Sequence, residues 1–395
     1  MANPNITVST NNTIETQKLA TVVALEVAKN AGFLKLASKD YFGSQINGNM
    51  KAGQSYDFIL PDAGNTVDGL VANPRDIVER KVSLSIKNKV NSVKTNALEG
   101  VTDIKWEKEI GPSYAANLIN KTLKEEVSKA VKEATTVFVG SGFKPIAEAG
   151  AYLQSITTED LQGFIDPMAQ AVLAANGQAF VPTGSPDALY GKGTLGNFQG
   201  VDYKSERWLD KVKINLTAEN AGVQGYTAST AQTDPAKIQL SGVTGTIKAG
   251  TPIFVDGCYA CDTIGMETNA PYAFIALGDV TANGVISAQP IYTADNGTRT
   301  CSKAPAAGDT VTLPDNGNYG LAYIRAKDAY NFSQVDKLDI KFSKEAAVGD
   351  VDGLRVSLNQ WTDGTSAENF SRWDFTYLAG TVEPRLVTLA MFKQG

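Results

Sequence analysis

The 395-residue sequence contains no histidine, and this absence excludes several classes of chemistry. Serine and cysteine nucleophiles that rely on a histidine base cannot be built from this chain, and histidine cannot serve as an acid, a base or a metal ligand. No Gly-x-Ser-x-Gly elbow and no Walker loop stands before a predicted helix. We therefore expect a protein that is not an enzyme and that has neither a cofactor nor a metal site.

Cysteine is scarce, and its three positions, Cys258, Cys261 and Cys301, do not form a disulfide framework. Cys258 and Cys261 have Cys-x-x-Cys spacing, but a zinc site would need a carboxylate as a further ligand. A thioredoxin-like motif should begin a helix, whereas residues 252–257 predict a strand and a turn. We expect free, partly buried thiols; a metal site and a redox role remain the alternatives.

Long hydrophobic runs and an excess of basic residues are also absent. No stretch reaches the roughly 20 apolar residues that cross a bilayer. The first residues lack the basic and apolar regions of a secretory signal. The formal net charge of −6 argues against a protein whose function is to grip nucleic acid. These properties predict a soluble cytoplasmic protein with the length of two to three domains.

Three helices are predicted in the first half of the chain. Residues 13–37 have a broad apolar face, with Gly32 interrupting the helix. From Pro112, apolar residues recur at spacings of three and four towards an end near 140–142, which gives a helix of about 38 Å at 1.5 Å per residue. No second helix of that length is present to complete a bundle, so we expect a strut along which other elements pack. A further helix is predicted over residues 158–176.

Between the first two helices the pattern predicts an unusual pair of strands. Residues 56–60 and 81–94 are strand-like and are separated by about twenty residues rich in Gly, Pro, Asn and Asp. A connection of that length usually marks a functional loop, and a two-stranded ribbon alone in water is marginally stable. The ribbon would be stable if it lay across another subunit; a disordered surface loop is the alternative.

Basic residues are concentrated on the returning arm of this ribbon, where they outnumber Asp76 and Glu79. We predict that they contact an acidic strip on a neighbouring subunit; a solvated strand face is the alternative. The six predicted inter-subunit contact residues are Arg75, Arg80, Lys81, Lys87, Lys89 and Lys94.

The second half of the chain is predicted to be rich in strands. Short apolar runs alternate with turn residues across 215–322, and residues 249–298 contain no Lys or Arg, which predicts an inserted all-β domain. Three strands with one buried face each follow near 354–358, 373–377 and 387–391, and they predict one C-terminal sheet. The aromatic residues of the second strand are predicted to pack in the core; a stacking platform for bases is the alternative.

Motifs near the carboxyl end resemble tailed-bacteriophage major capsid proteins. GLRVS at 353–357, SRWDFTYLAG at 371–380 and EPRLV at 383–387 resemble, in order, the family patterns Gly-Leu-Ser-Ile-Arg, Arg-x-Asp-x-Leu-Tyr-Gly and Pro-Arg-Leu-Ala. RAKDAYNF at 325–332 is similar to the family's stretch before that sheet, and KAGQS at 51–55 to the turn that opens its extended loop. The resemblance covers most of the chain from about residue 50 to 392.

The resemblance implies an α+β fold of the phage major capsid type known from phage Hong Kong 97. Residues 290–292 and 306–311 are similar to the end of the telokin-like domain inserted in coat proteins of short-tailed phages. The implied segments are an N-terminal arm and helix at 1–45, an extended loop at 46–100, a peripheral domain with its spine helix at 101–144, the first part of an axial domain at 145–214, an inserted β domain at 215–322, the axial return at 323–349 and the C-terminal sheet of the peripheral domain at 350–395.

The function that the resemblance implies is that of a major capsid protein, which self-assembles into the icosahedral shell around the double-stranded DNA genome of a tailed bacteriophage. The implied partners are copies of itself in hexamers and pentamers, a scaffolding protein, a portal, in some shells a decoration protein, and packaged DNA bound weakly and without sequence preference. No membrane partner is implied. The implied location is the virion capsid, after assembly in the cytoplasm of the bacterial host.

Two alternatives remain at this point. An encapsulin-like shell protein of a cellular nanocompartment would share the fold, although such shells usually lack an inserted β domain. A secreted, β-rich adhesion module is the other alternative, and the long amphipathic helix and the missing secretory signal count against it.

Overall fold

The chain forms two compact units in the computed structural model. One unit comprises Met1–Tyr56, Ser83–Glu126 and Asn331–Gly380, and the other comprises Asp57–Val82, Val127–Tyr330 and Thr381–Gly395. The structure describes residues 8–38, 53, 55–60, 80–96, 111–176, 196–209, 227–228, 237–280, 285–289, 299–334, 345–363, 365 and 368–394.

The first unit is built on a five-stranded sheet with helices on one face. The sheet has the order β15–β18–β17–β16, and β3 also pairs with β18. The elements of this unit are α1 (Val8–Asn30), α2 (Gly32–Lys35), most of α3 (Gly111–Lys132), β3 (Lys87–Asn96), β15 (Tyr330–Gln334), β16 (Glu345–Val351), β17 (Leu354–Asp363) and β18 (Glu368–Thr381).

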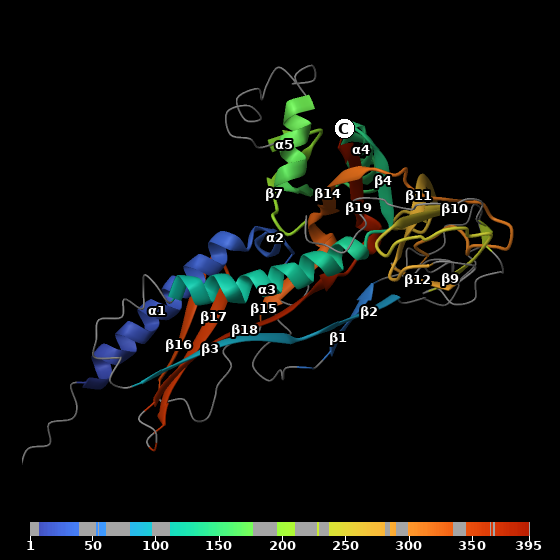
Figure 1. Cartoon of the computed structure of the whole chain (residues 1–395). Helices are drawn as coiled ribbons and strands as arrows, with labels where there is room; N and C mark the ends of the chain where they lie inside the picture. Colours follow the sequence, from blue (N-terminus) through green and yellow to red (C-terminus); the bar gives the residue numbers. More distant parts are fainter. Residues whose placement is uncertain are drawn as a thin grey trace, which may run out of the picture. The chain divides into compact units, whose positions relative to one another are not determined.

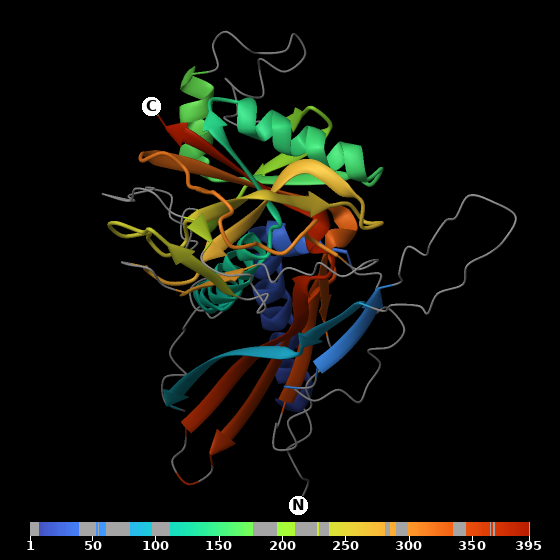
Figure 2. The same cartoon turned by 90° about the vertical axis from the view of Figure 1, so that its right-hand side faces the viewer.

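Helices α1 and α3 both lie along the strands of this sheet (Figures 1 and 2). A Cβ atom added to Gly349 of β16 would lie 2.1 Å from the backbone oxygen of Ala20, so α1 rests directly on the strand. The ring of Tyr114 in α3 lies 5.1 Å from that of Trp373 in β18, centroid to centroid. Apolar residues of both helices therefore cover the aromatic face of the sheet.

Burial confirms the expectations for the amino-terminal helix and for the aromatic strand. Several small apolar residues of α1 are fully buried, and the helix is interrupted at Ala31, before Gly32 begins α2. Trp373, Phe375 and Tyr377 are each exposed by 1% or less. These three aromatic side chains pack in the core, as predicted, and do not form a stacking platform.

The second unit contains a larger mixed sheet. Its strand order is β6–β7–β5–β14–β19–β4–β11–β12–β9–β8, with β10 joined to β11 and β13 joined to β10. The elements are β4 (Thr136–Ser141), α4 (Lys144–Ile156), β5 (Leu161–Ile165), α5 (Pro167–Asn176), β6 (Gly196–Phe198), β7 (Val201–Ser205), β8 (Thr227–Ala228), β9 (Lys237–Ser241), β10 (Pro252–Cys261), β11 (Glu267–Ala276), β12 (Val285–Gln289), β13 (Val311–Thr312), β14 (Asn318–Ala326) and β19 (Val387–Gln394).

The C-terminal strand β19 is the centre of this unit. It pairs in antiparallel fashion with β14 and in parallel with β4, and it is buried from Val387 to Phe392. Helix α5 approaches the same region closely, because a Cβ atom on Gly320 of β14 would lie 2.5 Å from Ala169 and from the ring of Phe392. The prediction that residues 387–391 join the C-terminal sheet of the other unit was wrong, since only tertiary contacts choose between two sheets for an apolar strand.

Three predicted helix boundaries were also wrong. Helix α1 begins at Val8, five residues before the predicted start at residue 13. The long helix α3 ends at Lys132, and the apolar run that follows it forms β4. Successive β-branched residues from Thr135 onwards favour a strand, and that strand finds a parallel partner in β19. The predicted helix over 158–176 begins with strand β5, and its helical part starts only at Pro167, where Asp166 accepts a hydrogen bond from the Ala169 amide at 3.0 Å. Helix α4 was not predicted.

The predicted ribbon consists of β1 (Ser55–Leu60) and β2 (Arg80–Ser85), which form a two-stranded sheet of their own. The single strand expected near residues 81–94 is in fact two strands, because the backbone leaves the strand conformation at Ile86. Its second half is β3, which leaves the ribbon and pairs with β18 from Lys87 to Asn96. A continuous alternation of apolar and polar residues does not reveal where a strand changes its partner.

The described residues between 227 and 312 contain strands and turns, as expected for an all-β stretch. These strands continue the large sheet, because Tyr272 of β11 pairs with Thr136 of β4. A separate inserted domain with the predicted boundaries of 215–322 stays a prediction. Residues 179–182, whose sequence also predicts a strand, lie outside the described residues.

Glu206, in the turn after β7, provides a pH-dependent test of the second unit. Its side chain is 5% exposed, and burial raises its pKa to about 7, although the Trp208 amide and Arg207 act in the opposite direction. The folded state therefore prefers the protonated carboxyl, whose stabilising contribution is complete below the unfolded pKa of about 4.5 and is lost as the pH rises through about 7.

Replacement of Glu206 by Gln should remove this dependence. Between pH 4 and pH 8 the free energy of unfolding of the native chain should fall by about 3 kcal/mol relative to that of the variant. Urea titrations at several pH values would measure it, with Glu148→Gln, at a half-exposed side chain, as a control for the loss of a glutamate. Parallel profiles for Glu206→Gln would contradict the prediction.

Candidate assembly surfaces

The six predicted contact residues divide into two groups. Arg75 lies outside the described residues, and the side chains of Arg80 and Lys81 do so too, although their backbone belongs to β2. The other three lysines lie on β3, and each forms an ion pair with a carboxylate of its own chain. Their contact with a neighbouring subunit stays a prediction.

Lys87 is part of a buried network between β3, β18 and α3. Its Nζ atom lies 2.6 Å from Oε1 of Glu126, whose side chain is fully buried. The hydroxyl of Tyr377 donates to the same oxygen at 3.0 Å. Burial, reinforced by the negative charge of Glu126, holds the pKa of Tyr377 well above its usual value. The tyrosine therefore stays a hydrogen-bond donor, and the network fastens α3 to the sheet.

Two further lysines of β3 form more exposed pairs. Lys89 lies 2.5 Å from Oε2 of Glu125, and Lys94 contacts Glu368 on the adjacent β18. Ion pairs at this level of exposure stabilise a protein by at most about 1 kcal/mol. They leave these lysines available to exchange partners when another charged surface approaches. The sequence pattern could not reveal Glu125 as a partner, because it lies more than thirty residues away along the chain.

The outer face of α3 carries exposed basic side chains that differ from those of β3 in forming no ion pair with a described residue. Lys121 and Lys124 are exposed, and neither forms an ion pair with any residue that the structure describes. Leu118, Leu123 and Val127 on the opposite side are buried. The helix therefore presents a positive strip to its surroundings while its apolar side packs on the sheet.

The face of the sheet opposite α1 and α3 carries a polar network around Asp374. Its carboxylate is fully buried and is held by the guanidinium of Arg372, with N–O distances of 2.8–3.0 Å. The amide of Asn88 in β3 donates to it at 2.9 Å, and the hydroxyl of Thr376 donates to Asn88 at 3.0 Å. Side-chain hydrogen bonds thus reinforce the backbone pairing of β3 with β18.

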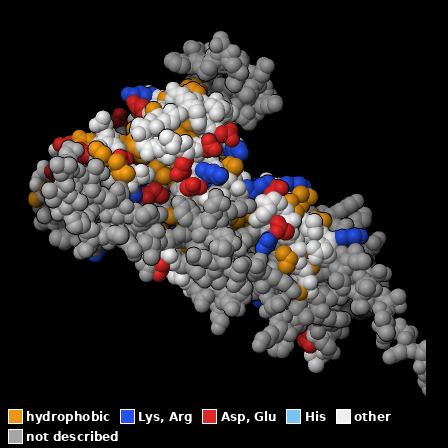
Figure 3. All heavy atoms as spheres, turned by 180° about the vertical axis from the view of Figure 1, so that it is seen from behind, with side chains coloured by type: hydrophobic (Ala, Val, Ile, Leu, Met, Phe, Trp, Pro, Cys, Tyr) orange, Lys and Arg blue, Asp and Glu red, His pale blue; other side chains and the backbone are white. Residues whose placement is uncertain are grey.

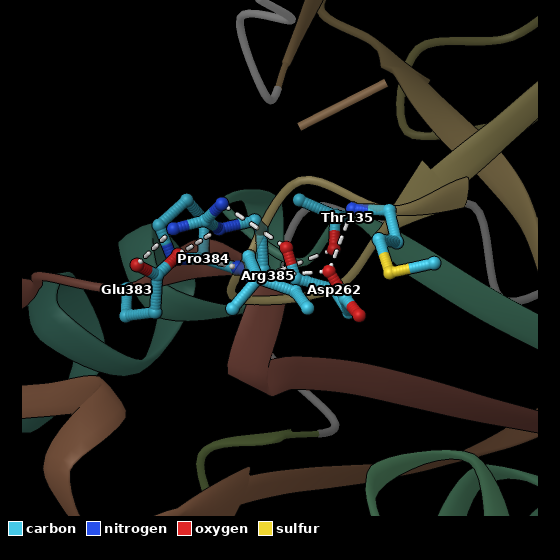
Figure 4. Close-up of polar contacts among 7 residues, drawn as sticks. Thr135, Asp262, Glu383, Pro384 and Arg385 are labelled. Carbon is cyan, nitrogen blue, oxygen red and sulfur yellow. Dashed lines mark hydrogen bonds and ion pairs between the residues drawn. The ribbon is translucent and has the colours of Figure 1, made fainter. Parts of the chain in front are cut away.

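In the other unit, the side chain of Arg385 acts as a clamp on the turn between β10 and β11 (Figure 4). Arg385 forms a two-pronged pair with the carboxylate of Glu383 at 2.8 and 2.9 Å, and its third nitrogen donates to the backbone oxygen of Asp262 at 3.0 Å. Burial by itself would lower the pKa of Arg385, but the hydrogen bonds and charge of Glu383 raise it above the usual value. The buried arginine therefore stays charged and fixes the turn.

The clamped turn presents two apolar side chains to solvent. Ile264 is 54% exposed and Met266 is 60% exposed. Their amides donate to Oδ1 of Asp262 at 3.0 and 2.7 Å, and Arg299 donates to the backbone oxygen of Gly265. A turn with so many fixed backbone groups loses little entropy when another surface covers it. Exposed apolar residues on such a turn are suited to contact with another protein.

Acidic and basic side chains are interspersed over the described part of the face in Figure 3. Within the described ranges, no three His, Cys, Asp or Glu side chains come together in a way that would hold a metal ion. None of the described helices is long and apolar enough to span a membrane.

Comparison with known proteins finds similarity to solved structures only. A structure from Mycobacterium phage Che8 has a TM-score of 0.46 and 11% identity, covering 90% of this chain and 89% of its own. The capsid structure of the cyanophage P-SCSP1u has a TM-score of 0.45 and 10% identity, covering 88% and 86%. A virus-like particle from Pyrococcus furiosus has a TM-score of 0.41 and 10% identity, covering 94% and 97%. No family model matches the chain, and no curated protein matches it.

The chain is thus similar to phage capsid structures over about nine tenths of its length. Two features of the candidate surfaces escaped the sequence analysis. One is the buried network of Glu126, and the other is the clamp of Arg385 on the β10–β11 turn. The only sequence signal for the second was the Glu383-Pro384-Arg385 motif itself, which does not show what the arginine binds.

Proposed function

We propose that this chain is a capsid shell protein that assembles with copies of itself. In finer detail, it is the major capsid protein of a tailed bacteriophage, and its icosahedral shell of hexamers and pentamers encloses double-stranded DNA. Its role is structural and not catalytic. The proposal rests on the ribbon of β1 and β2, supported by the family resemblance of the carboxyl-terminal motifs.

The ribbon of β1 and β2 is the main observation that supports self-assembly. Its two strands pair with each other and with no other strand among the described residues. A ribbon of that kind is marginally stable in water, and its outer edges keep backbone groups that can pair with another chain. The ribbon is therefore stabilised when it lies on a neighbouring copy. Its basic residues, Arg80 and Lys81, favour an acidic surface there.

The mechanism of assembly is the addition of many modest contacts. Each copy offers the ribbon, the basic strip of α3 and the exposed turn at Ile264 and Met266. Contacts of this kind are individually reversible, so that misplaced copies can leave. Their combined strength in a closed lattice greatly exceeds that of any one contact. A scaffolding protein and a portal would guide closure, and a decoration protein would add to the finished shell.

The acidic balance of the chain suits a container for DNA. A net charge of −6 leaves little excess of basic residues to bind phosphates, so contact with the packaged genome is weak, non-specific and sensitive to salt. The DNA can then leave the shell. Assembly takes place in the cytoplasm of the bacterial host, and the finished protein is located in the virion.

Electron microscopy of the purified full-length protein tests the proposal. We expect closed particles or tubes, formed in a concentration-dependent manner and visible beside any remaining free subunits. Subunits that stay monomeric in sedimentation at every concentration would overturn self-assembly. The contents of particles recovered from native cells decide between the two kinds of shell. Long double-stranded DNA supports the phage capsid, whereas a packaged enzyme without DNA supports a nanocompartment and overturns the finer proposal.

A further inference from the structure

Three cysteines lie in the second unit, and two of them, Cys258 and Cys301, lie on neighbouring segments at diagonal positions of the pairing. Cys258 lies on β10, and Cys301 lies in the segment that pairs with this strand through the bridge between Ala260 and Cys301. Hydrogen bonds from Cys261 to Thr300 at 3.0 Å and from Ser302 to Tyr259 at 2.8 Å fix the same antiparallel register. These contacts place residue 303 opposite residue 258.

In this register the thiols of Cys258 and Cys301 project from the same face. Side chains alternate along a strand, so Cys258 lies on the side of Ala260, which pairs with Cys301. The Cys301 thiol lies 3.0 Å from the backbone oxygen of Lys303 and is therefore directed towards Cys258. Both side chains are buried, with exposed fractions of 1% for Cys258 and 0% for Cys301.

We propose that Cys258 and Cys301 are a disulfide site, which a peroxide oxidant closes within one chain. One thiolate attacks a peroxide oxygen and becomes a sulfenic acid, and the neighbouring thiol then attacks that sulfur and releases water. In balance, two thiols and one hydrogen peroxide give one disulfide and two waters. The bond fastens the segment at 299–303 to β10, where a single bridge and a few hydrogen bonds now hold it.

Cys261 does not share this arrangement, and it provides the matched control. Its surroundings are Arg299, Asp262 and Arg385, and burial raises its pKa to about 11. It is fully buried, as Cys301 is, so access of the oxidant does not distinguish the two. If proximity selects the pair, Cys261 stays reduced while the other two react.

The pH dependence of the reaction follows from the surroundings of Cys301. Its hydrogen bond with Cys258, together with burial, holds its pKa well above the usual value for a thiol. Lys303, two residues after Cys301, forms an ion pair with Asp309 at 3.2 Å. Because the thiolate is the nucleophile, oxidation should be slow near neutral pH and should become faster by up to about tenfold for each unit of pH.

The test uses the full-length protein, purified under reducing conditions and then treated with hydrogen peroxide. Free thiols are then blocked with N-ethylmaleimide under denaturing conditions, which expose the buried cysteines, and the intact mass and the non-reducing peptide map are recorded. We expect the loss of two hydrogen atoms, one remaining blocked thiol at Cys261, and a linked peptide pair containing Cys258 and Cys301. The oxidised chain should also melt several degrees higher than the reduced chain, because the bond closes a long loop.

Variants separate the pair from the third thiol. Cys258→Ala and Cys301→Ala should each abolish the loss of two hydrogens, and Cys261→Ala should leave it unchanged. If an alanine variant fails to fold, the peptide map of the native sequence still decides the connectivity. A disulfide that includes Cys261, a disulfide between chains, or oxidation to sulfinic acid without a disulfide overturns the proposal. A lower melting temperature of the disulfide form overturns its stabilising role.

Discussion

Deletion of residues 62–73, between β1 and β2, is expected to abolish closed shells while leaving the monomer folded. The two large sheets hold the buried core, and among the described residues the ribbon pairs with no strand of either sheet. Shortening the connection should therefore cost the free subunit little. The same change removes most of the connection between the two strands that we propose to lie on a neighbouring copy. Circular dichroism and urea unfolding report on the monomer, and sedimentation with electron microscopy reports on assembly.

A matched control for this deletion keeps the length of the chain. Replacement of residues 62–73 by a Gly–Ser segment of equal length removes the side chains without drawing β1 and β2 together, and it should also lose the shells. If the deletion destabilises the monomer, this variant of equal length is used to test assembly in its place. Intact particles from either variant would show that this segment does not hold the lattice together.

The second large effect is expected from Gly349→Val, which should detach α1 from the five-stranded sheet. The added Cβ would lie 2.1 Å from the oxygen and 2.4 Å from the carbonyl carbon of Ala20, and 2.9 Å from the amide of Thr21. These atoms belong to the helix backbone, so no change of rotamer relieves the clash. Fully buried Val23 and Val27 on the same helix would lose their packing. We expect a loss of about 3 kcal/mol or more in the free energy of unfolding.

Urea unfolding and hydrogen exchange of the α1 amides would measure this effect. Gly278→Val is a suitable control, because a Cβ atom at that position meets no atom within 4 Å. The control should change the free energy of unfolding by less than about 0.5 kcal/mol. Equal effects of the two substitutions would show that α1 does not depend on close contact with β16.

The sequence was informative wherever local pattern and structure coincide. Gly32 indicated the break that the structure places at Ala31, and the apolar face of α1 and the buried aromatic side chains of β18 follow from periodicity. So do the strands near residues 253 and 274, where turn residues enclose short apolar runs. The capsid resemblance came from short motifs that follow one another in the order of the family patterns.

The contacts at the candidate assembly surfaces were harder to predict from the sequence. Charge counting identified Lys87 and Lys89 as basic residues on a strand, but it could not show that Glu126 and Glu125 of α3 lie beside them. Nor does any local pattern show that Arg385 reaches the turn at Asp262, more than one hundred residues earlier. Such pairs depend on how helices and strands pack, and that is decided by contacts between distant parts of the chain.

By itself, the sequence determined the apolar faces of α1 and α3, the buried aromatic side of β18, and that histidine-dependent chemistry is excluded. Only the tertiary structure decided that the apolar run after α3 becomes β4, that β3 leaves the ribbon for β18, and that β19 belongs to the larger sheet. The physical reason is the same in each case. An apolar or alternating segment is stabilised by burial against several possible partners, and the choice among them depends on hydrogen bonds and packing across the fold, which local propensity does not contain.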